Sequence, residues 1–156
     1  MSIEAHLLHD LIRVAADRHG AAKALASGAD ELDYASLQAQ VAALASGLVA
    51  LGLERTGRVG VYLEKRLETV VASFAAPAAG GVMVPMNPLL KPEQVAFIAQ
   101  DCNVRVLVTS PERLAALLPV LAACTDLRHV ILTAAPREPL ALPPGLSLHA
   151  WAEVLA

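Results

Sequence analysis

The sequence predicts an α/β protein in which helices cover both faces of a mainly parallel sheet, a three-layer sandwich. From residue 59 onward, short apolar runs alternate with segments of helical periodicity. Strands separated by helices are joined by crossovers, and crossover connections make them parallel. The chain of 156 residues is long enough for a sizeable core, and its 56% hydrophobic but only 3% aromatic residues make that core aliphatic.

The N-terminal third supplies two helices and a hairpin. Residues 6–19 have apolar side chains at helical spacing, and residues 22–26 and 31–33 are expected to pair as two short strands. Asp33 is a good N-cap for the helix that follows, because its carboxylate can accept free amide hydrogens of the first turn. One apolar stripe runs along that helix before Gly52 ends it: Leu37, Val41, Leu44, Leu48 and Leu51.

The remaining elements alternate regularly. The expected strands cover residues 59–63, 82–84, 104–109 and 130–133, and the expected helices cover 67–79, 92–101 and a segment opened by Pro111. The run at 82–84 is typical of a strand covered on both faces. Asn103 is predicted to adopt a left-handed conformation after the second of these helices.

Prolines mark the irregular places. Pro77 should kink or end its helix, and Pro119 should divide the helix after Pro111 into two short pieces. Residues 134–146 hold four prolines and one glycine and are typical of a surface loop. We therefore predict an α/β unit over residues 1–133, followed over 134–156 by a Pro-rich linker and a short terminal helix.

Composition excludes several classes of function. The net charge is −3 and no block of one sign occurs, which argues against binding to nucleic acid or anionic lipid. Cys102 and Cys124 form no CxxC pattern, so neither a disulfide framework nor a zinc knuckle is expected. No apolar stretch reaches 18 residues and charges occur early, at Glu4 and Asp10, so we expect no membrane span and a cytoplasmic location.

The loops at the carboxyl ends of the strands are the first places to look for chemistry. Glu64, Lys65 and Arg66 follow the first strand of the alternating part, where they could face a ligand. A solvated charged turn with a local ion pair is the favoured interpretation. No GxGxxG or Walker lysine motif occurs, and the glycines at 57 and 60 precede a strand instead of following one, so a dinucleotide or P-loop site is not supported.

Histidines offer a second candidate. His6, His9 and Asp10 share one helix face at a spacing that suits a metal, but a further ligand is missing, so an exposed polar face is favoured. His129 and His149 are isolated in the sequence and are expected to be surface residues.

The candidate nucleophiles have structural explanations. Ser110 is better placed as an N-cap than as a nucleophile, because no histidine accompanies it in sequence. Cys102 and Cys124 have no activating partner and are expected to be buried or half-buried structural residues. No catalytic, cofactor-binding or metal-binding residue is therefore assigned.

Two segments resemble motifs of a known family. Residues 32–37 (LDYASL) are similar to its early L-T/S-Y-x-E-L motif, and residues 79–88 (AGGVMVPMNP) are similar to its A-G-A-x-x-V-P-L-N/D-P motif. Over roughly its whole length the chain resembles the N-terminal part, and hence the N-terminal subdomain fold, of AMP-forming acyl-CoA ligases in the adenylating-enzyme superfamily. The wider run looks most like ligases associated with bacterial exosortase systems. Ser36 replaces the family's usual Glu, and Pro77 falls where relatives carry a helix-compatible residue.

The resemblance implies an activity for a longer enzyme. That enzyme would activate a carboxylic acid with ATP as an acyl-adenylate and then transfer the acyl group to CoA, with ATP, Mg and CoA as cofactors. The family's phosphate loop ending in Pro-Lys-Gly and its C-terminal catalytic lysine are not in this sequence, so we expect an N-terminal fragment that is inactive alone. Its expected partners are the remainder of the ligase and, through exposed apolar surface, other copies of itself.

Two alternatives stay open. The chain could be a non-catalytic binding or interaction module that keeps a ligase-like fold. It could also be a flavodoxin-like nucleotide binder, which suits the alternation of strands and helices but lacks a phosphate loop.

Overall fold

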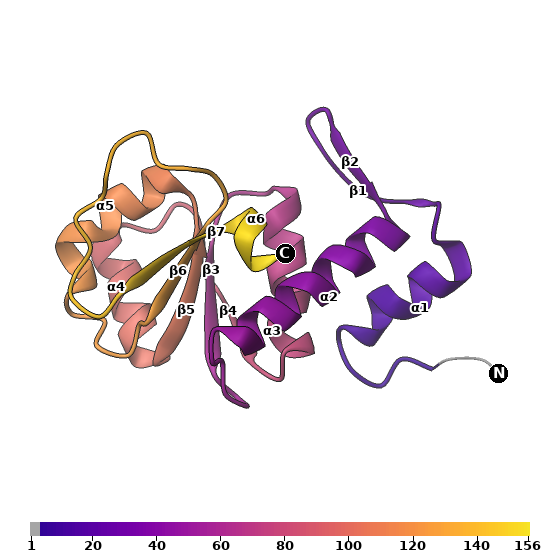
Figure 1. Ribbon diagram of the computed structural model, residues 1–156, viewed down its shortest axis with the longest axis horizontal. Coiled ribbons are helices and arrows are strands. Elements are labelled where there is room, and N and C mark those ends of the chain that lie inside the picture. Colours follow the sequence, from indigo (N-terminus) through magenta and orange to yellow (C-terminus); the bar gives the residue numbers. More distant parts are fainter. Residues whose placement is uncertain (1–3) are drawn as a thin grey trace.

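A computed structural model describes residues 4–156 and contains a five-stranded, fully parallel sheet between two layers of helices (Figure 1). The strand order is β4-β3-β5-β6-β7. The strands are β3 (Arg58–Tyr62), β4 (Val82–Pro85), β5 (Val104–Thr109), β6 (His129–Leu132) and β7 (Ser147–Ala150). This arrangement confirms the predicted α/β class with a parallel sheet.

The helices divide between the two faces. Helices α2 (Tyr34–Ala50), α3 (Leu67–Ala78) and the short α6 (Trp151–Val154) lie on one face, and α4 (Pro92–Asp101) and α5 (Pro111–Leu121) lie on the other (Figure 1). Helix α1 (Asp10–His19) packs on α2, farther from the sheet. The predicted hairpin is present as β1 (Lys23–Ser27) and β2 (Asp30–Asp33).

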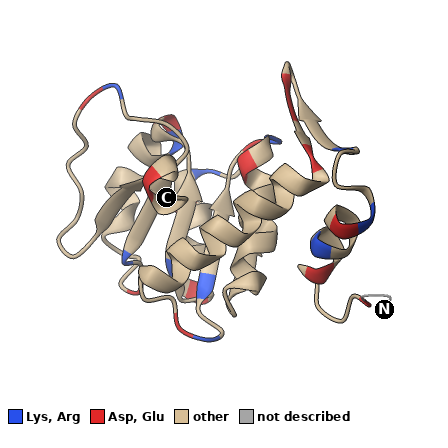
Figure 2. Ribbon diagram, turned by 45° about the vertical axis from the view of Figure 1, so that its right-hand side comes forward, with Lys and Arg blue, Asp and Glu red and all other residues tan. Residues whose placement is uncertain are grey.

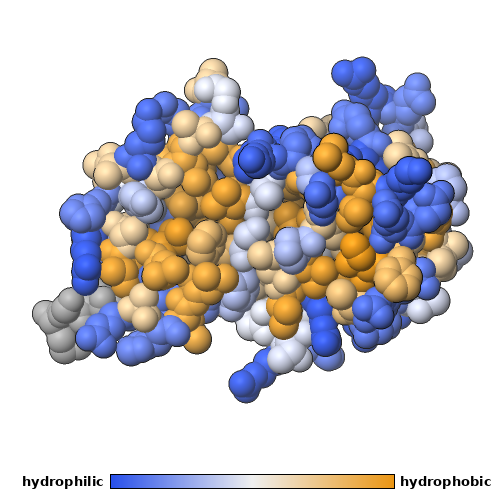
Figure 3. Space-filling view, turned by 180° about the vertical axis from the view of Figure 1, so that it is seen from behind, coloured by the Kyte–Doolittle hydropathy of each residue, from blue (hydrophilic) through white to orange (hydrophobic). Residues whose placement is uncertain are grey.

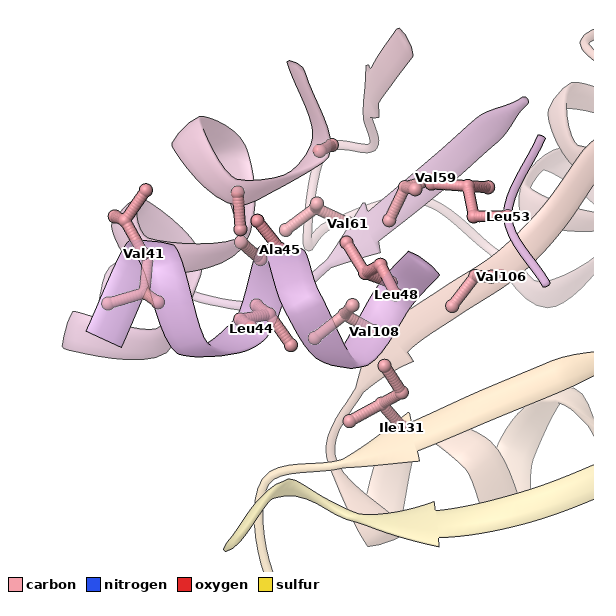
Figure 4. Packing of buried hydrophobic residues seen from close by; sticks show 14 of the residues in the cluster. Val41, Leu44, Ala45, Leu48, Leu53, Val59, Val61, Val106, Val108 and Ile131 are labelled. Atoms are coloured by element: carbon pink, nitrogen blue, oxygen red, sulfur yellow. The ribbon is translucent and has the colours of Figure 1, made fainter. Parts of the chain in front are cut away.

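The buried side of helix α2 supplies much of the hydrophobic core on the first face of the sheet. The Asp33 carboxylate accepts the backbone N–H of Ser36 at 2.7 Å, as expected for an N-cap. Four members of the predicted stripe are fully buried, and Figure 4 shows part of this packing against side chains of the sheet: Leu37, Val41, Leu44 and Leu48. The aliphatic core on this side therefore follows from the helical spacing read in the sequence.

Several predicted boundaries agree with the structure. Helix α4 and strand β5 begin and end at the predicted residues, and Asn103 between them has the expected positive φ of 52°. Helix α3 ends at Ala78, one residue after Pro77, and Gly80 beyond it has the positive φ of 80° that is typical of a helix stop.

Two predictions about local order were wrong. Helix α5 runs unbroken through Pro119 to Leu121, because Pro119 lies in its last turn, where the missing amide interrupts the helix ladder only near its end. The first helix begins at Asp10 and not at residue 6, because the Asp10 carboxylate accepts the backbone N–H groups of His6 and Leu7, which holds those residues outside the helix.

The outer strands of the sheet also differ from expectation. Strand β4 is an edge strand whose one neighbour in the sheet is β3, and Val82 at its start is 45% exposed. The next two residues are covered as predicted, since Met83 packs against the core on one face of the sheet and Val84 against the core on the other. The segment 134–146 is a loop without regular structure, as predicted, but Ser147–Ala150 after it pairs with β6 as a fifth strand. The chain beyond residue 133 therefore adds a strand to the same sheet as well as the expected short helix.

The sheet has one irregularity in register. Arg58 lies opposite Val104 and Val59 lies opposite Val106, so Arg105 is an extra residue on β5. Such a bulge redirects the side chain that it carries. Among the described residues, no helix is long and apolar enough to span a membrane.

Candidate functional site

The carboxyl ends of β3, β4 and β5 meet at one edge of the sheet, the edge at which open parallel sheets bind ligands. Glu64 and Arg66 follow β3, the loop of residues 86–91 follows β4, and Arg113 lies in the first turn of α5, which follows β5. We call this set of residues the carboxyl-edge cluster. The sequence pattern indicates Glu64, Lys65 and Arg66 at this edge but not Arg113.

Arg113 is the centre of the carboxyl-edge cluster. Its Nε donates to Glu64 Oε2 at 3.0 Å, and its terminal nitrogen donates to the backbone carbonyl of Pro88 at 2.8 Å. The guanidinium carbon also lies 4.8 Å from the centre of the Tyr62 ring, within the range of a cation–π contact. One side chain thus connects the ends of β3 and α5 with the loop after β4.

The other charges at this edge pair with one another. Arg66 binds Glu68 through two parallel hydrogen bonds of 2.7 and 2.8 Å and reaches Glu64 at 3.4 Å. This geometry confirms the predicted local ion pair. Lys65 is exposed.

These pairs keep the charged groups ionised. The pKa of Glu64 is lowered, first by a hydrogen bond from its own backbone amide and then by Arg113 and Arg66. The pKa of Arg66 is raised, chiefly by its hydrogen bonds to Glu68. A lowered carboxyl pKa disfavours proton transfer near neutral pH, so neither group is tuned as a general acid or base.

Two further hydrogen bonds fix the backbone around the cluster. The Tyr62 hydroxyl donates to the carbonyl of Leu90 at 2.9 Å, and the buried Thr109 hydroxyl donates to the carbonyl of Tyr62 at the same distance. Ser110 is buried, and its hydroxyl accepts the backbone N–H of Arg113 at 3.4 Å, which confirms its role as the α5 N-cap. The described residues give this hydroxyl no histidine partner.

The N-terminal polar group consists of a hydrogen-bonded turn before α1 and an ion pair. Asp10 accepts hydrogen bonds from Arg13 and from the amides of Leu7 and His6, and these bonds lower its pKa to about 2, with the Arg13 bond the largest cause. Within residues 4–156, no group of three or more His, Cys, Asp and Glu side chains could hold a metal ion.

The two C-terminal histidines form a pair, so the prediction that they are isolated surface residues was wrong. His129 Nδ1 lies 3.0 Å from His149 Nε2. The two rings are tilted relative to each other, and their centroids are 5.1 Å apart. They meet because β7 joins the sheet beside β6, which sequence analysis did not foresee. Burial lowers the pKa of His129, and the neighbouring His149 lowers it further.

The cysteines behave as predicted. Cys102 is half-buried and Cys124 is buried, and both are free thiols. Burial raises the pKa of Cys124, which makes its reactive thiolate form rarer still.

The carboxyl-edge cluster is therefore a clamp that positions loops. Glu64, Glu68 and the Pro88 carbonyl engage Arg66 and Arg113, and these residues place no nucleophile next to a base. Sequence analysis missed Arg113 because its partners Glu64 and Pro88 lie 49 and 25 residues away. The only local signal was its place in the first turn after Ser110 and Pro111.

The fold and this edge define a class: a three-layer α/β unit whose structural neighbours are the N-terminal domains of adenylate-forming ligases. Residues 12–148 match the family described as AMP-binding enzyme. The chain belongs to this family, as its two sequence motifs indicated.

Individual relatives come from several branches of adenylate-forming enzymes. The chain is 31% identical over 103 residues to nonribosomal peptide synthetase 8 of Aspergillus fumigatus, covering 66% of this chain and 1% of that protein. It is 30% identical over 115 residues to the peroxisomal long chain acyl-CoA synthetase 7 of Arabidopsis thaliana, covering 73% and 16%. Coronafacic acid ligase of Pectobacterium brasiliense has the same fold, with a TM-score of 0.86 at 18% identity over 96% of this chain and 29% of that chain.

The chain thus spans less than a third of each of these proteins. The family is established at this coarse level, while the activity of a complete enzyme, its substrate and its partners are matters of proposal.

Proposed function

We propose that this chain is the N-terminal α/β part of an AMP-forming acyl-CoA ligase and is inactive alone. The observation that carries the proposal is the family match over residues 12–148, together with an acyl-CoA synthetase among the relatives. The complete enzyme would use ATP and Mg to convert a carboxylic acid to an acyl-adenylate, and CoA to accept the acyl group. We place it in the cytoplasm and regard an exosortase-associated ligase as its nearest subfamily.

The carboxyl-edge cluster supports the inactivity of the isolated chain. Its arginines are occupied by Glu64, Glu68 and the Pro88 carbonyl, so these cations do not present a free cradle for ATP phosphates. Phosphate binding in nucleotide enzymes relies on glycine-rich loops with free backbone amides, and the loops after β3, β4, β5 and β6 contain no glycine-rich run.

The direct test is ATP–pyrophosphate exchange with the purified 156-residue chain and a panel of carboxylic acids. The expected result is exchange no higher than in a protein-free blank. Acid-dependent exchange above the blank would contradict the proposed inactivity.

The kind of acyl acceptor and substrate needs a second test, because relatives include a peptide synthetase as well as an acyl-CoA synthetase. For a complete ligase that carries this chain at its N-terminus, we expect exchange with fatty or aromatic acids and formation of a CoA thioester. Exchange driven by amino acids without formation of a CoA thioester would assign the chain to a peptide synthetase instead.

An interaction module is the second candidate function. It is favoured by large apolar side chains on the surface, among them Phe97 at 68% and Leu89 at 89% exposed. Figure 3 shows broad hydrophobic areas on one side of the molecule. These surfaces suit either the remainder of a ligase or another copy of the chain.

A further inference from the structure

A basic hollow lies at the amino edge of the sheet, opposite the carboxyl-edge cluster. The hollow has a volume of about 450 Å³ and is bounded by the α2–β3 connection and by the first residues of β3, β5 and β6. Its size falls in the range of small-molecule sites. Figure 2 shows blue segments around this lower end of the sheet and on the α2–β3 loop.

Arginine is the dominant charged residue of the hollow. Four arginines line it, against Glu54 and Asp126 as the acidic residues, which leaves a local net charge of +2 in a chain whose overall charge is −3: Arg55, Arg58, Arg105 and Arg128. A concave surface that concentrates one sign of charge raises the local concentration of counter-ions.

The fold brings these arginines together from distant parts of the sequence. Arg58 begins β3 beside Val104 of β5, Arg105 is the extra residue of the β5 bulge, and Arg128 donates its backbone N–H to the carbonyl of Arg105 at 2.9 Å. Bulges recur next to functional sites because they redirect a side chain. Thr56, which follows Arg55, has a positive φ of 64°, a conformation that costs energy in a residue other than glycine.

The arginines differ in how far they are already engaged. Arg105 reaches Asp126 at 3.4 Å, and Arg128 donates to the carbonyls of Thr125 and Leu127 at 2.6 and 3.2 Å. For the side chains of Arg55 and Arg58, residues 4–156 supply no hydrogen bond or ion pair, and both residues are exposed. Two guanidinium groups are therefore free to bind a ligand. The third, that of Arg105, is held by Asp126 alone, through its carboxylate and its backbone carbonyl, both at 3.4 Å.

We propose that this hollow binds a small phosphate-bearing anion, with Arg55 and Arg58 as its main ligands and Arg105 as a third. Guanidinium groups present paired N–H donors that match the oxygens of phosphate. A dianionic phosphate group would balance the local charge of +2. The proposal is independent of the ligase function, since it concerns the opposite edge of the sheet.

A small ligand fits this place better than a nucleic acid or an acidic protein. The four arginines line one hollow, whereas an extended polyanion requires a stripe of cations along the surface.

The first experiment is calorimetric titration of the 156-residue chain with inorganic phosphate, pyrophosphate and AMP at low salt. We expect saturable binding of at least one of them that weakens as salt is added, and the tightest of the three identifies the source of the phosphate group. Absence of saturable binding by all three, or tighter binding of an oligonucleotide or polyglutamate, would overturn the proposal.

Matched arginine variants locate the site. Arg58→Gln and Arg55→Gln should each weaken binding about tenfold, as expected for loss of a charge-assisted hydrogen bond. Arg137→Gln removes the same charge from the exposed loop after β6 and should leave the affinity unchanged. An equal loss of affinity in Arg137→Gln would show that only the overall charge of the chain matters, and it would contradict a binding site in this hollow.

A substitution of Asp126 should change the binding affinity in the opposite direction. Its carboxylate competes with the anion for Arg105, so Asp126→Asn should tighten binding severalfold, whereas damage to a merely structural contact would weaken it. Circular dichroism of each variant verifies that it is folded. If Arg58→Gln does not fold, Arg58→Lys, which keeps the charge but loses the paired donors, should still weaken binding. Unchanged affinity in Arg58→Lys together with weaker binding in Asp126→Asn would refute the assignment.

Discussion

Arg113 shows how one side chain can hold together loops that the sequence separates widely. Its guanidinium contacts Glu64, the Pro88 carbonyl and the Tyr62 ring, which belong to three different segments of the carboxyl edge. Because Glu64 is half exposed, its ion pair with Arg113 contributes little alone. The bond to the Pro88 carbonyl matters more, since it fixes the loop after β4.

Substitution of Arg113 tests this clamp. Arg113→Gln should lower the free energy of unfolding by about 1–2 kcal/mol, the cost of a lost charge-assisted hydrogen bond to a partly buried carbonyl. Urea unfolding measures this loss, and hydrogen exchange should rise in residues 86–91. Arg137→Gln is the matched control and should change stability by less than about 0.5 kcal/mol. Equal stability of the two variants would show that Arg113 is not a clamp.

Gly47 is a second residue whose identity is set by close packing. A Cβ atom at this position of α2 would lie far inside contact distance of the backbone carbonyl oxygen of Val154, at the end of α6. Alanine normally stabilises a helix by about 1 kcal/mol relative to glycine, so two effects oppose each other here. The backbone contact decides the sign, because a carbonyl oxygen cannot move aside as a flexible side chain can.

Gly47→Ala should therefore destabilise the chain by about 1–2 kcal/mol and release α6 from α2. Thermal unfolding and hydrogen exchange at residues 151–155 measure the two effects. Ser46→Ala, next to it on the exposed side of α2, should change stability by less than about 0.5 kcal/mol. A more stable Gly47→Ala variant would show that α6 does not press on α2.

At the scale of elements, β7 depends on its pairing with β6, which places His149 against His129. In the folded chain the pKa of His129 is below its ordinary value of 6.5, because burial and His149 both disfavour its charged form. The unfolded chain therefore binds more protons than the folded chain below about pH 6.5. Stability is complete above that pH and decreases as the pH falls through it.

Melting temperatures between about pH 8 and pH 5 test this coupling. The chain should lose stability below about pH 6.5, and His149→Gln should reduce that loss because it removes the neighbouring charge. His19→Gln, an exposed substitution in α1, should leave the pH dependence unchanged. This range avoids the carboxylates with lowered pKa values, such as Asp10, whose contributions are lost only in more acidic solution. A flat pH profile for the unsubstituted chain would contradict the role of the pair.

Elements with a strong local signal were predictable. Helix α4 and strand β5 have clear periodicity and sharp boundaries at Pro92 and Asn103, and the α2 stripe fixed which face is buried. Strand β7 was not predictable, since its four residues have no apolar run and take their place through tertiary contacts, the backbone pairing with β6 and the packing of Leu148 against the core. The carboxyl-edge cluster and the histidine pair were not predictable for the same reason. Both are formed by residues far apart in the sequence, and the strand order decides which of these become neighbours.

At the scale of the whole molecule, several large apolar side chains are exposed on the surface. Leu89 is 89% exposed and Phe97 is 68% exposed, and Val82 is exposed on β4, an edge strand with one unpaired side. Exposed edge strands and apolar patches both promote association between chains. Figure 3 shows hydrophobic areas on one side of the molecule, which would be covered in a longer enzyme or in an assembly of several copies.

We therefore expect the isolated chain to self-associate as its concentration rises. Light scattering after size-exclusion chromatography should show a growing average mass, because burying Phe97 and Leu89 removes apolar surface from water. Val82→Lys should reduce the association by placing a charge on the open edge of β4, and the double substitution Leu89→Gln and Phe97→Gln should reduce it further. Ala152→Gln, on exposed α6 away from β4, is the matched control and should have no effect. A constant monomer mass across the whole concentration range would mean that these side chains do not drive association, and an equal reduction in Ala152→Gln would mean that any added polar residue has the same effect.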